Sequence, residues 1–195
     1  MPPEKFGSRP RKKAMSKQYE SELNIKLLDA SLQKLASNFK CGNIHIDNFL
    51  KSNQALDDGF GKTYVWLEDD NAGIIGYYNI SVGCVDSLEG EAHVKMGGAI
   101  HINEFALDTK YRGVSAAPGT DINLSDLLLK DCINRVLFLR SEFVGFSFIT
   151  LQSTKEGYGL YSRNEFEDIE DDMSVSKLPD SEKSCWSMYL ALDLE

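Results

Sequence analysis

Apolar residues recur along the chain in short alternating or continuous runs, and the period of each run predicts a strand or a helix. Residues 23–28 and 62–68 alternate between apolar and polar positions, and residues 74–85 form a longer run of β-prone residues. The polar stretch 69–73 separates the last two runs and favours a turn. The sequence therefore predicts an N-terminal strand followed by a β-hairpin.

Apolar residues three and four positions apart predict helices around these strands. Residues 29–39 and 43–55 have this spacing, and a short helix is expected at 155–163. The strongest pattern covers 126–140, where apolar residues occupy a broad face. Ser125 precedes this helix and is predicted to be its N-cap, because a serine hydroxyl can accept a hydrogen bond from the first free amides.

Three further strands are predicted at 99–107, 144–151 and 186–192, with an additional one at 173–176. An antiparallel start followed by a strand–helix–strand crossover indicates a sheet of mixed direction with helices on its faces. We therefore expect an α/β fold with a mixed, mostly antiparallel sheet of six to seven strands flanked by helices.

Length and hydrophobicity are those of one soluble domain. The chain has 195 residues, of which 42% are hydrophobic, enough to fill one core, and we expect residues 18–195 to form a single domain. No segment approaches the roughly 18–20 uninterrupted apolar residues of a membrane span, and the N-terminus lacks an apolar signal sequence. The sequence favours a cytoplasmic protein with no membrane partner.

Charge is distributed unevenly. Residues 1–17 carry six Lys or Arg and one Glu, and their composition predicts a disordered basic extension. The remaining residues carry 15 positive and 29 negative side chains, a net charge of −14. Binding to nucleic acid depends on cationic groups that neutralise phosphates, so this balance argues against a nucleic-acid partner.

The sequence indicates no metal site. The four cysteines are far apart and lack the paired spacings of zinc sites, so we expect them to be reduced and mostly buried. His45, His93 and His101 also lack the spacing of metal ligands. Surface or structural roles are expected for all three histidines.

A central segment resembles a known family. Residues 102–113, Ile-Asn-Glu-Phe-Ala-Leu-Asp-Thr-Lys-Tyr-Arg-Gly, precede the strongest predicted helix and resemble the strand, loop and helix core of the GNAT acyltransferases. Residues 160–166 resemble the family's helix end, where a Tyr is followed by Gly-Phe, although Glu165 occupies the glycine position. Four more segments, 39–43, 46–51, 62–65 and 75–78, resemble the GNAT branch that includes toxins acetylating aminoacyl-tRNA, and the likeness extends over about residues 23–192.

The resemblance implies acetyl-coenzyme A as the acyl donor. In this fold a strand splays from its neighbour and offers unpaired main-chain groups to the pantetheine arm, and Ala106 and Leu107 are expected to make these bonds. A loop beginning at Arg112 would hold the diphosphate. The donor-binding residues implied by the resemblance are Phe105, Ala106, Leu107, Arg112, Gly113 and Ser125.

The resemblance also implies two catalytic side chains. The acceptor must react as a neutral amine, and Glu104 is the candidate base that removes a proton directly or through water. Tyr161 is the candidate acid that protonates the departing thiolate. The alternatives are a solvated or ion-paired strand carboxylate for Glu104 and ordinary aromatic packing for Tyr161. A homodimer is consistent with the family, because the edges of its sheets often pair between subunits.

The expected diphosphate loop departs from the family pattern. The short glycine turn is replaced by the longer segment 114–124, and Asp126 in the first helical turn is expected to repel the diphosphate. The segment either wraps the donor, using Ser115 and an unusual dihedral at Gly119, or is a surface insertion. At the other end of the motif, Asn164 can take the left-handed conformation that glycine would adopt.

Three functions remain open at this point, and the sequence favours the first of them over the other two. The first is transfer of an acetyl group from acetyl-coenzyme A to a primary amine of a small molecule, peptide or protein, by direct attack in a ternary complex. The second is a toxin-like acetylation of aminoacyl-tRNA. The third is a GNAT-derived binding module whose altered loop has lost affinity for the cofactor.

Overall fold

The computed structural model describes residues 19–89, 92–170, 173–175 and 185–192. The basic extension predicted at 1–17 lies outside the described residues. The strands are β1 (Ile25–Leu27), β2 (Lys62–Leu67), β3 (Ile74–Glu89), β4 (Ala92–Leu107), β5 (Phe148–Ser153), β6 (Glu167–Asp168), β7 (Met173–Val175) and β8 (Trp186–Ala191). The helices are α1 (Ile44–Lys51), α2 (Leu124–Glu142) and α3 (Tyr158–Ser162), with 3-10 turns η1 (Leu32–Asn38), η2 (Asn53–Leu56), η3 (Asp58–Phe60) and η4 (Thr109–Tyr111).

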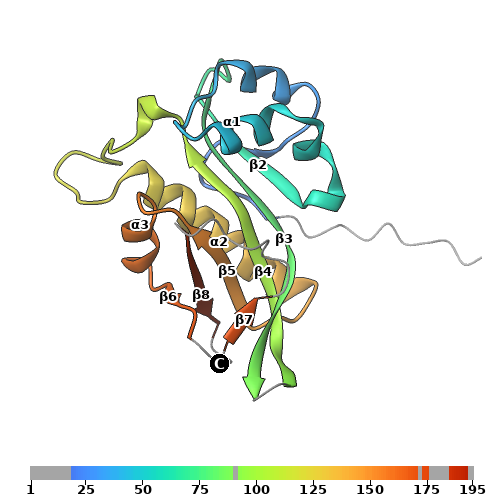
Figure 1. The fold of residues 1–195 in the computed structure, drawn as a ribbon. Helices are drawn as coiled ribbons and strands as arrows, with labels where there is room; N and C mark the ends of the chain where they lie inside the picture. Colours follow the sequence, from blue (N-terminus) through green and yellow to red (C-terminus); the bar gives the residue numbers. More distant parts are fainter. Residues whose placement is uncertain (1–18, 90–91, 171–172, 176–184, 193–195) are drawn as a thin grey trace, which may run out of the picture.

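One mixed sheet runs through the molecule in the order β1-β2-β3-β4-β5-β8-β6, and β7 pairs with β3 (Figure 1). Among the strands that the structure describes, only β4 and β5 are parallel, as the predicted crossover requires. The mixed, mostly antiparallel α/β fold is therefore confirmed. The expected count of six to seven strands was too low, because the described residues form eight. The two-residue strand β6 lies in an acidic segment and pairs with β8 through its backbone, so no apolar pattern marks it.

Several predicted boundaries differ from the structure. The helix expected at 29–39 is the 3-10 turn η1, and the one expected at 43–55 ends at Lys51. Ser52 interrupts it, since its side chain accepts a hydrogen bond from the Gln54 amide and starts the separate turn η2. The N-cap of α2 is Asn123, not Ser125, because Asn123 and Asp126 form a capping box.

The sheet is covered on both faces, and the alternation along its strands explains why (Figure 1). In β2, Trp66 belongs to the core under α2 and α3, whereas Val65 and Leu67 belong to the core under η1 and α1. Neighbouring tyrosines of β3 divide in the same way: Tyr78 packs with the first core and Tyr77 with the second. Both faces of the central strands are therefore apolar.

A β-bulge and a split in the sheet shape the middle of the fold. The register between β3 and β4 shifts at Asn103, which is the extra residue between the pairs Ile80–Ile102 and Asn79–Glu104. On the other side, β4 pairs with β5 only from Ala99 to Ile102. Beyond Ile102 the two parallel strands separate, and the last five residues of β4 have no strand partner on that side.

Candidate active site

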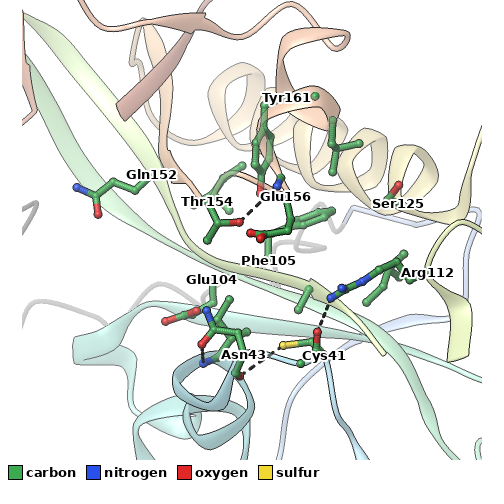
Figure 2. A pocket seen from close by; sticks show the side chains of 18 of the residues that line it. Cys41, Asn43, Glu104, Phe105, Arg112, Ser125, Gln152, Thr154, Glu156 and Tyr161 are labelled. Carbon is green, nitrogen blue, oxygen red and sulfur yellow. Dashed lines mark hydrogen bonds between the residues drawn. The ribbon is translucent and has the colours of Figure 1, made fainter. Parts of the chain in front are cut away.

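A cleft of ≈ 740 Å³ opens where β4 and β5 separate (Figure 2). Its floor is the exposed edge of β4, and its walls come from the start of α1, the start of α2, and α3 with the loop before it. The lining residues are Cys41, Gly42, Asn43, Ile44, Ile46, Ile102, Asn103, Glu104, Phe105, Ala106, Leu107, Arg112, Ser125, Gln152, Thr154, Glu156, Gly157, Gly159, Leu160, Tyr161 and Arg163. Of the predicted site residues, only Gly113 does not line this cleft.

The bulge decides which main-chain groups face the split. The Asp108 amide donates to Ile75 of β3, and paired residues in an antiparallel ladder alternate in their bonding direction. The backbone of Ala106 is therefore directed towards β3, while the N–H and C=O of Phe105 and Leu107 face the open side. This placement corrects the expected pair Ala106 and Leu107: the groups available to an extended ligand belong to Phe105 and Leu107.

Glu104 lies on β4 at the split, half-buried, and burial raises the pKa of its carboxyl to about 7. Among the described residues its carboxylate has no hydrogen-bond or ion-pair partner, so the alternative of an ion-paired strand carboxylate does not apply. A carboxyl with a pKa near neutrality exchanges protons readily at physiological pH. Glu104 therefore has the properties of a general base.

Tyr161 projects from α3 into the cleft, on the other side of β4 from Glu104 (Figure 2). Its ring packs edge-on against Phe105, with centroids 6.0 Å apart, and against Phe166, with centroids 5.7 Å apart. Burial, with smaller effects of Cys132 and Glu104, raises the pKa of its phenol well above the usual value. Within the described residues the hydroxyl has no hydrogen-bond partner, so it stays protonated and able to donate to a group in the cleft.

The turn after α3 fixes the Tyr161 ring. Glu165 itself adopts the left-handed conformation, with φ 69°, so the expectation that Asn164 would do so is wrong. The amide of Phe166 donates to the carbonyl of Tyr161 and that of Glu165 to Ser162, the two bonds of a Schellman motif. Phe166 is thereby buried beside Tyr161. The helix end keeps its geometry although glycine is absent.

Segment 114–124 projects from the body of the fold as a loop before α2 (Figure 1). Ser115 and Asn123 form an isolated β-bridge, and the Ser115 hydroxyl donates to the carbonyls of Ala117 and Thr120. Gly119 has the expected positive φ, 79°. Arg112 lines the cleft and donates to the carbonyl of Cys41, which ties the end of β4 to the segment before α1.

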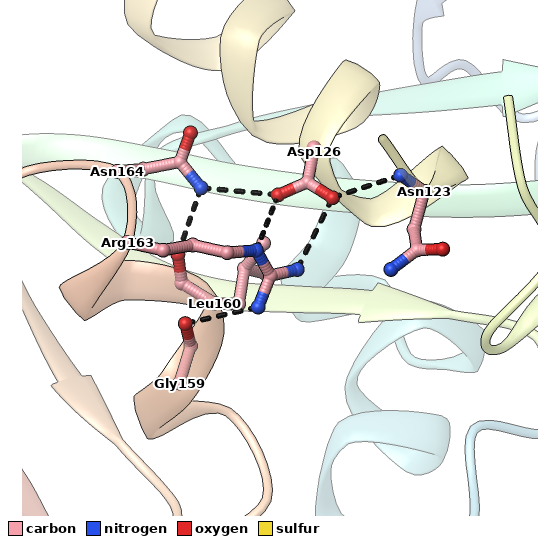
Figure 3. Close-up of polar contacts among 6 residues, drawn as sticks. All are labelled: Asn123, Asp126, Gly159, Leu160, Arg163 and Asn164. Carbon is pink, nitrogen blue, oxygen red and sulfur yellow. Dashed lines mark hydrogen bonds and ion pairs between the residues drawn. The ribbon is translucent and has the colours of Figure 1, made fainter. Parts of the chain in front are cut away.

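Asp126, expected to repel a diphosphate, does not line the cleft. Its carboxylate is paired with Arg163 and accepts further bonds from Asn123 and Asn164 (Figure 3). Ser125, although not the N-cap, does line the cleft. The cationic side chains Arg112 and Arg163 lie towards the α2 end of the cleft, and Glu104 lies towards the α1 side.

Sequence reasoning missed the residues contributed by segments outside the motif, namely Asn43, Ile44 and Ile46 at the start of α1, and Gln152, Thr154, Glu156 and Arg163 around α3. Only Asn43 has a local signal, since an Asn before an apolar helical run is a typical N-cap. It accepts bonds from the amides of His45 and Ile46.

No helix of the described part is long and apolar enough to cross a membrane. The described residues also contain no group of three or more His, Cys, Asp or Glu side chains that could hold a metal ion. His101, one of the three histidines of the sequence, is a partly buried residue of β4, and its Nδ1 lies 2.9 Å from the hydroxyl of Thr150 on β5. Burial lowers the pKa of His101 to about 4, so this histidine is neutral.

Comparison with known proteins points to one group. The probable toxin TacT of Sinorhizobium fredii (strain NBRC 101917 / NGR234) is 28% identical over 148 residues, which cover 67% of this chain and 77% of the relative. No family model matches the chain.

Solved structures of similar fold include AtaTR bound with acetyl-coenzyme A, with a TM-score of 0.62 and 17% identity over 87% of this chain and 93% of that chain. AtaT complexed with acetyl-methionyl-tRNAfMet gives a TM-score of 0.58 at 17% identity, covering 79% of this chain and 94% of that one. The KacTA–DNA complex gives a TM-score of 0.59 at 20% identity over 79% of this chain and 92% of that chain.

Two of these similar structures contain a nucleic acid, so the inference from net charge that argued against a nucleic-acid partner is not supported. The strand order, the split between β4 and β5, and the comparisons agree with the resemblance seen in the sequence. The fold of the chain is therefore that of these solved toxin structures, and its sequence is similar to that of a probable toxin, in line with the resemblance to the GNAT branch that includes toxins.

Proposed function

We propose that the chain transfers the acetyl group of acetyl-coenzyme A to the α-amine of an aminoacyl-tRNA. The observation that carries the proposal is the placement of Glu104 and Tyr161 on two sides of one open strand edge. The similarity to a probable toxin and to a structure containing an acetylated aminoacyl-tRNA supports this choice of acceptor over other amines.

The open edge of β4 accounts for donor binding. The pantetheine arm carries amides, and the free N–H and C=O of Phe105 and Leu107 can pair with them as an added strand would. This contact uses the backbone, so it does not depend on the altered diphosphate loop. The thioester would then lie near Phe105, between Glu104 and the Tyr161 ring.

Glu104 suits an α-amine better than a lysine side chain. An α-amine has an ordinary pKa of about 7.7–8.0, so roughly a third of it is neutral at pH 7.5, whereas only about 0.1% of a lysine amine with a pKa near 10.4 is neutral. A base with a pKa of about 7 can accept the proton that such an amine loses as it attacks.

The chemical step is a direct displacement. The amine nitrogen bonds to the acetyl carbon, its proton passes to Glu104, and the C–S bond breaks with its electron pair on sulfur. The sulfur receives the Tyr161 proton. The tyrosinate then recovers a proton from water, which the raised pKa of Tyr161 favours, and Glu104 returns its proton to water, so both groups are restored. The products are an amide and a thiol, and no covalent enzyme intermediate is formed.

The charge of the chain restricts how a tRNA can bind. With a net charge of −14 outside residues 1–17, broad contact with the phosphate backbone is unfavourable. The proposal therefore places the aminoacyl end at the α1 side of the cleft, where Asn43, Ile44 and Ile46 surround the approach to Glu104.

The test is an acetylation assay on purified protein. Charged tRNA, the same tRNA without its amino acid, a lysine-containing peptide and a polyamine are each incubated with acetyl-coenzyme A, and products are identified by mass spectrometry. The proposal predicts N-acetylation of the charged tRNA at a kcat/KM well above that of the other amines. Preferential acetylation of the peptide or the polyamine would replace the proposed acceptor, and donor binding without any transfer would favour a binding module.

A further inference from the structure

Asp126 is the centre of a saturated cluster of hydrogen bonds at the start of α2 (Figure 3). Its Oδ1 accepts from Arg163 Nε at 2.9 Å and from Asn164 Nδ2 at 3.1 Å. Its Oδ2 accepts from Arg163 Nη2 at 3.1 Å and from the Asn123 amide at 2.9 Å. Partial burial acts to raise the pKa of Asp126, but these bonds outweigh it and lower that pKa. The carboxylate is ionised and has no free position for another donor.

Arg163 keeps part of its hydrogen-bonding capacity. A guanidinium has five N–H groups. Two of them bind Asp126, and one on Nη1 donates to the carbonyl of Gly159 at 2.9 Å. One N–H on Nη1 and one on Nη2 are left over. The side chain is 46% exposed and lines the cleft, whereas the Asp126 side chain is 14% exposed and does not. The guanidinium thus covers the carboxylate and faces the cleft.

The start of α2 offers few amides to an anion. The Asp126 amide donates to the carbonyl of Asn123, and the Leu124 amide donates to the carbonyl of Val114. The family's usual means of holding a diphosphate, free amides at this helix start, is therefore reduced here. An anion at this end of the cleft needs side-chain cations, and among the described lining residues these are Arg112 and Arg163.

We propose that Arg163 binds the diphosphate of the acyl donor with the N–H groups that Asp126 and Gly159 leave free. Asp126 acts as a positioning residue, because its two-point contact fixes the plane of the guanidinium. The same contact neutralises Asp126, which removes the repulsion expected from the sequence. This inference rests on the donor-binding part of the proposed function and adds a residue from α3 to it.

The arrangement links donor binding to catalysis. Arg163 follows Tyr161 by two residues, and Asn164 connects Asp126 to the carbonyl of Leu160 within α3. A diphosphate bound to Arg163 therefore contacts the same short helix that carries the phenol. Helix α3 has only five residues and depends on such contacts for its position.

The test measures binding of three probes by calorimetry: acetyl-coenzyme A, its 3′-dephospho form, and S-acetylpantetheine, which lacks the diphosphate. In Arg163→Gln, the dissociation constants of both coenzyme A forms should rise about tenfold to one-hundredfold, the usual effect of losing a charged hydrogen bond. That of S-acetylpantetheine should stay the same. Arg163→Lys keeps the positive charge but not the planar guanidinium with its paired N–H groups, so it should give an intermediate loss of affinity. Lys155→Gln removes a nearby exposed cation that does not line the cleft, and should change none of the three.

The outcomes separate this inference from the proposed function. Wild-type protein that binds none of the probes would overturn donor binding itself. Wild-type binding together with unchanged affinities in Arg163→Gln would overturn the role of Arg163 alone. A loss for acetyl-coenzyme A but not for its 3′-dephospho form would assign Arg163 to the 3′-phosphate and contradict the diphosphate assignment. If Arg163→Gln fails to fold, Arg163→Lys decides by the same comparison.

Discussion

The two ends of the cleft are built in different ways. At the open edge of β4 the groups offered to the donor are main-chain N–H and C=O of Phe105 and Leu107, placed by a bulge and by the separation from β5. At the start of α2 the groups are the side chains of Arg112 and Arg163, and the second depends on its pairing with Asp126. A backbone site tolerates sequence change, whereas a side-chain site does not. The altered diphosphate loop therefore affects one end only.

The largest effect is expected from Tyr161→Phe, at the end of the cleft formed by the open edge of β4. Loss of the hydroxyl should lower kcat by about 10²–10³-fold, within the usual contribution of a positioned proton donor, and leave donor affinity unchanged. Stopped assays with a fixed acceptor, together with donor titration, measure both quantities. Tyr158→Phe is the matched control, since Tyr158 lies on the same helix but bonds to Asp168 and does not line the cleft. Unchanged turnover in Tyr161→Phe would remove this residue from the mechanism.

A smaller loss of turnover, about 10–10²-fold, is expected for Glu104→Gln, because water can replace part of a general base. Burial raises the pKa of Glu104 to about 7, so the carboxyl is protonated below pH 7 and ionised above it. Wild-type kcat should therefore rise with pH through about 7 and then level off, and this limb should be absent in Glu104→Gln. Glu22→Gln removes an exposed charge away from the cleft and should keep the wild-type profile. If kcat of Glu104→Gln rises with pH in the same way as kcat of the wild type, the titrating group is not Glu104.

At the other end of the cleft, at the start of α2, Asp126→Ala should lower the free energy of unfolding by about 1–2 kcal/mol. It removes the capping box of α2 and the contacts with Arg163 and Asn164. Because the pKa of Asp126 is lowered in the folded state, this stabilisation is present above the unfolded pKa, near 3.9, and is lost as pH falls through the folded value. Urea unfolding measures the difference at pH 7. Asp121→Ala, in the neighbouring exposed loop, should change stability little, and an equal loss there would contradict the role of the cluster.

The smallest effect concerns the end of α3. Glu165 has φ 69°, a conformation that glycine adopts without strain, so Glu165→Gly should stabilise the protein by about 0.5–1 kcal/mol. Glu165→Ala removes the same charge but keeps the strain, and should give no such gain. Thermal unfolding of the two variants distinguishes them, and an equal gain in both would assign the effect to charge.

The same contrast between the two ends of the cleft explains which parts of the fold and of the site could be predicted from the sequence. The period of apolar residues predicted the central strands. The open strand edge at Glu104 and Phe105 was expected from the resemblance to the GNAT family. Tyr161 was predicted from its place in the motif. The bulge at Asn103 has no local signal, so the backbone contacts were expected at Ala106 and Leu107, whereas the structure directs the groups of Phe105 and Leu107 to the open side.

Arg163 was missed for a different reason. Its function depends on Asp126, which is 37 residues away in the chain, and a single sequence does not show which charges pair across such a distance. Taken alone, Asp126 indicated repulsion of a phosphate. The pairing with Arg163 reverses that interpretation, because the carboxylate is covered and the guanidinium faces the cleft.

The account depends most directly on where the acyl donor binds, and a crystal structure of the protein with acetyl-coenzyme A tests it. We predict that the pantetheine amides pair with the backbone of Phe105 and Leu107, that the sulfur lies within hydrogen-bonding distance of the Tyr161 hydroxyl, and that the diphosphate contacts Arg163. A donor bound elsewhere, or one whose sulfur lies far from Tyr161, would contradict the account.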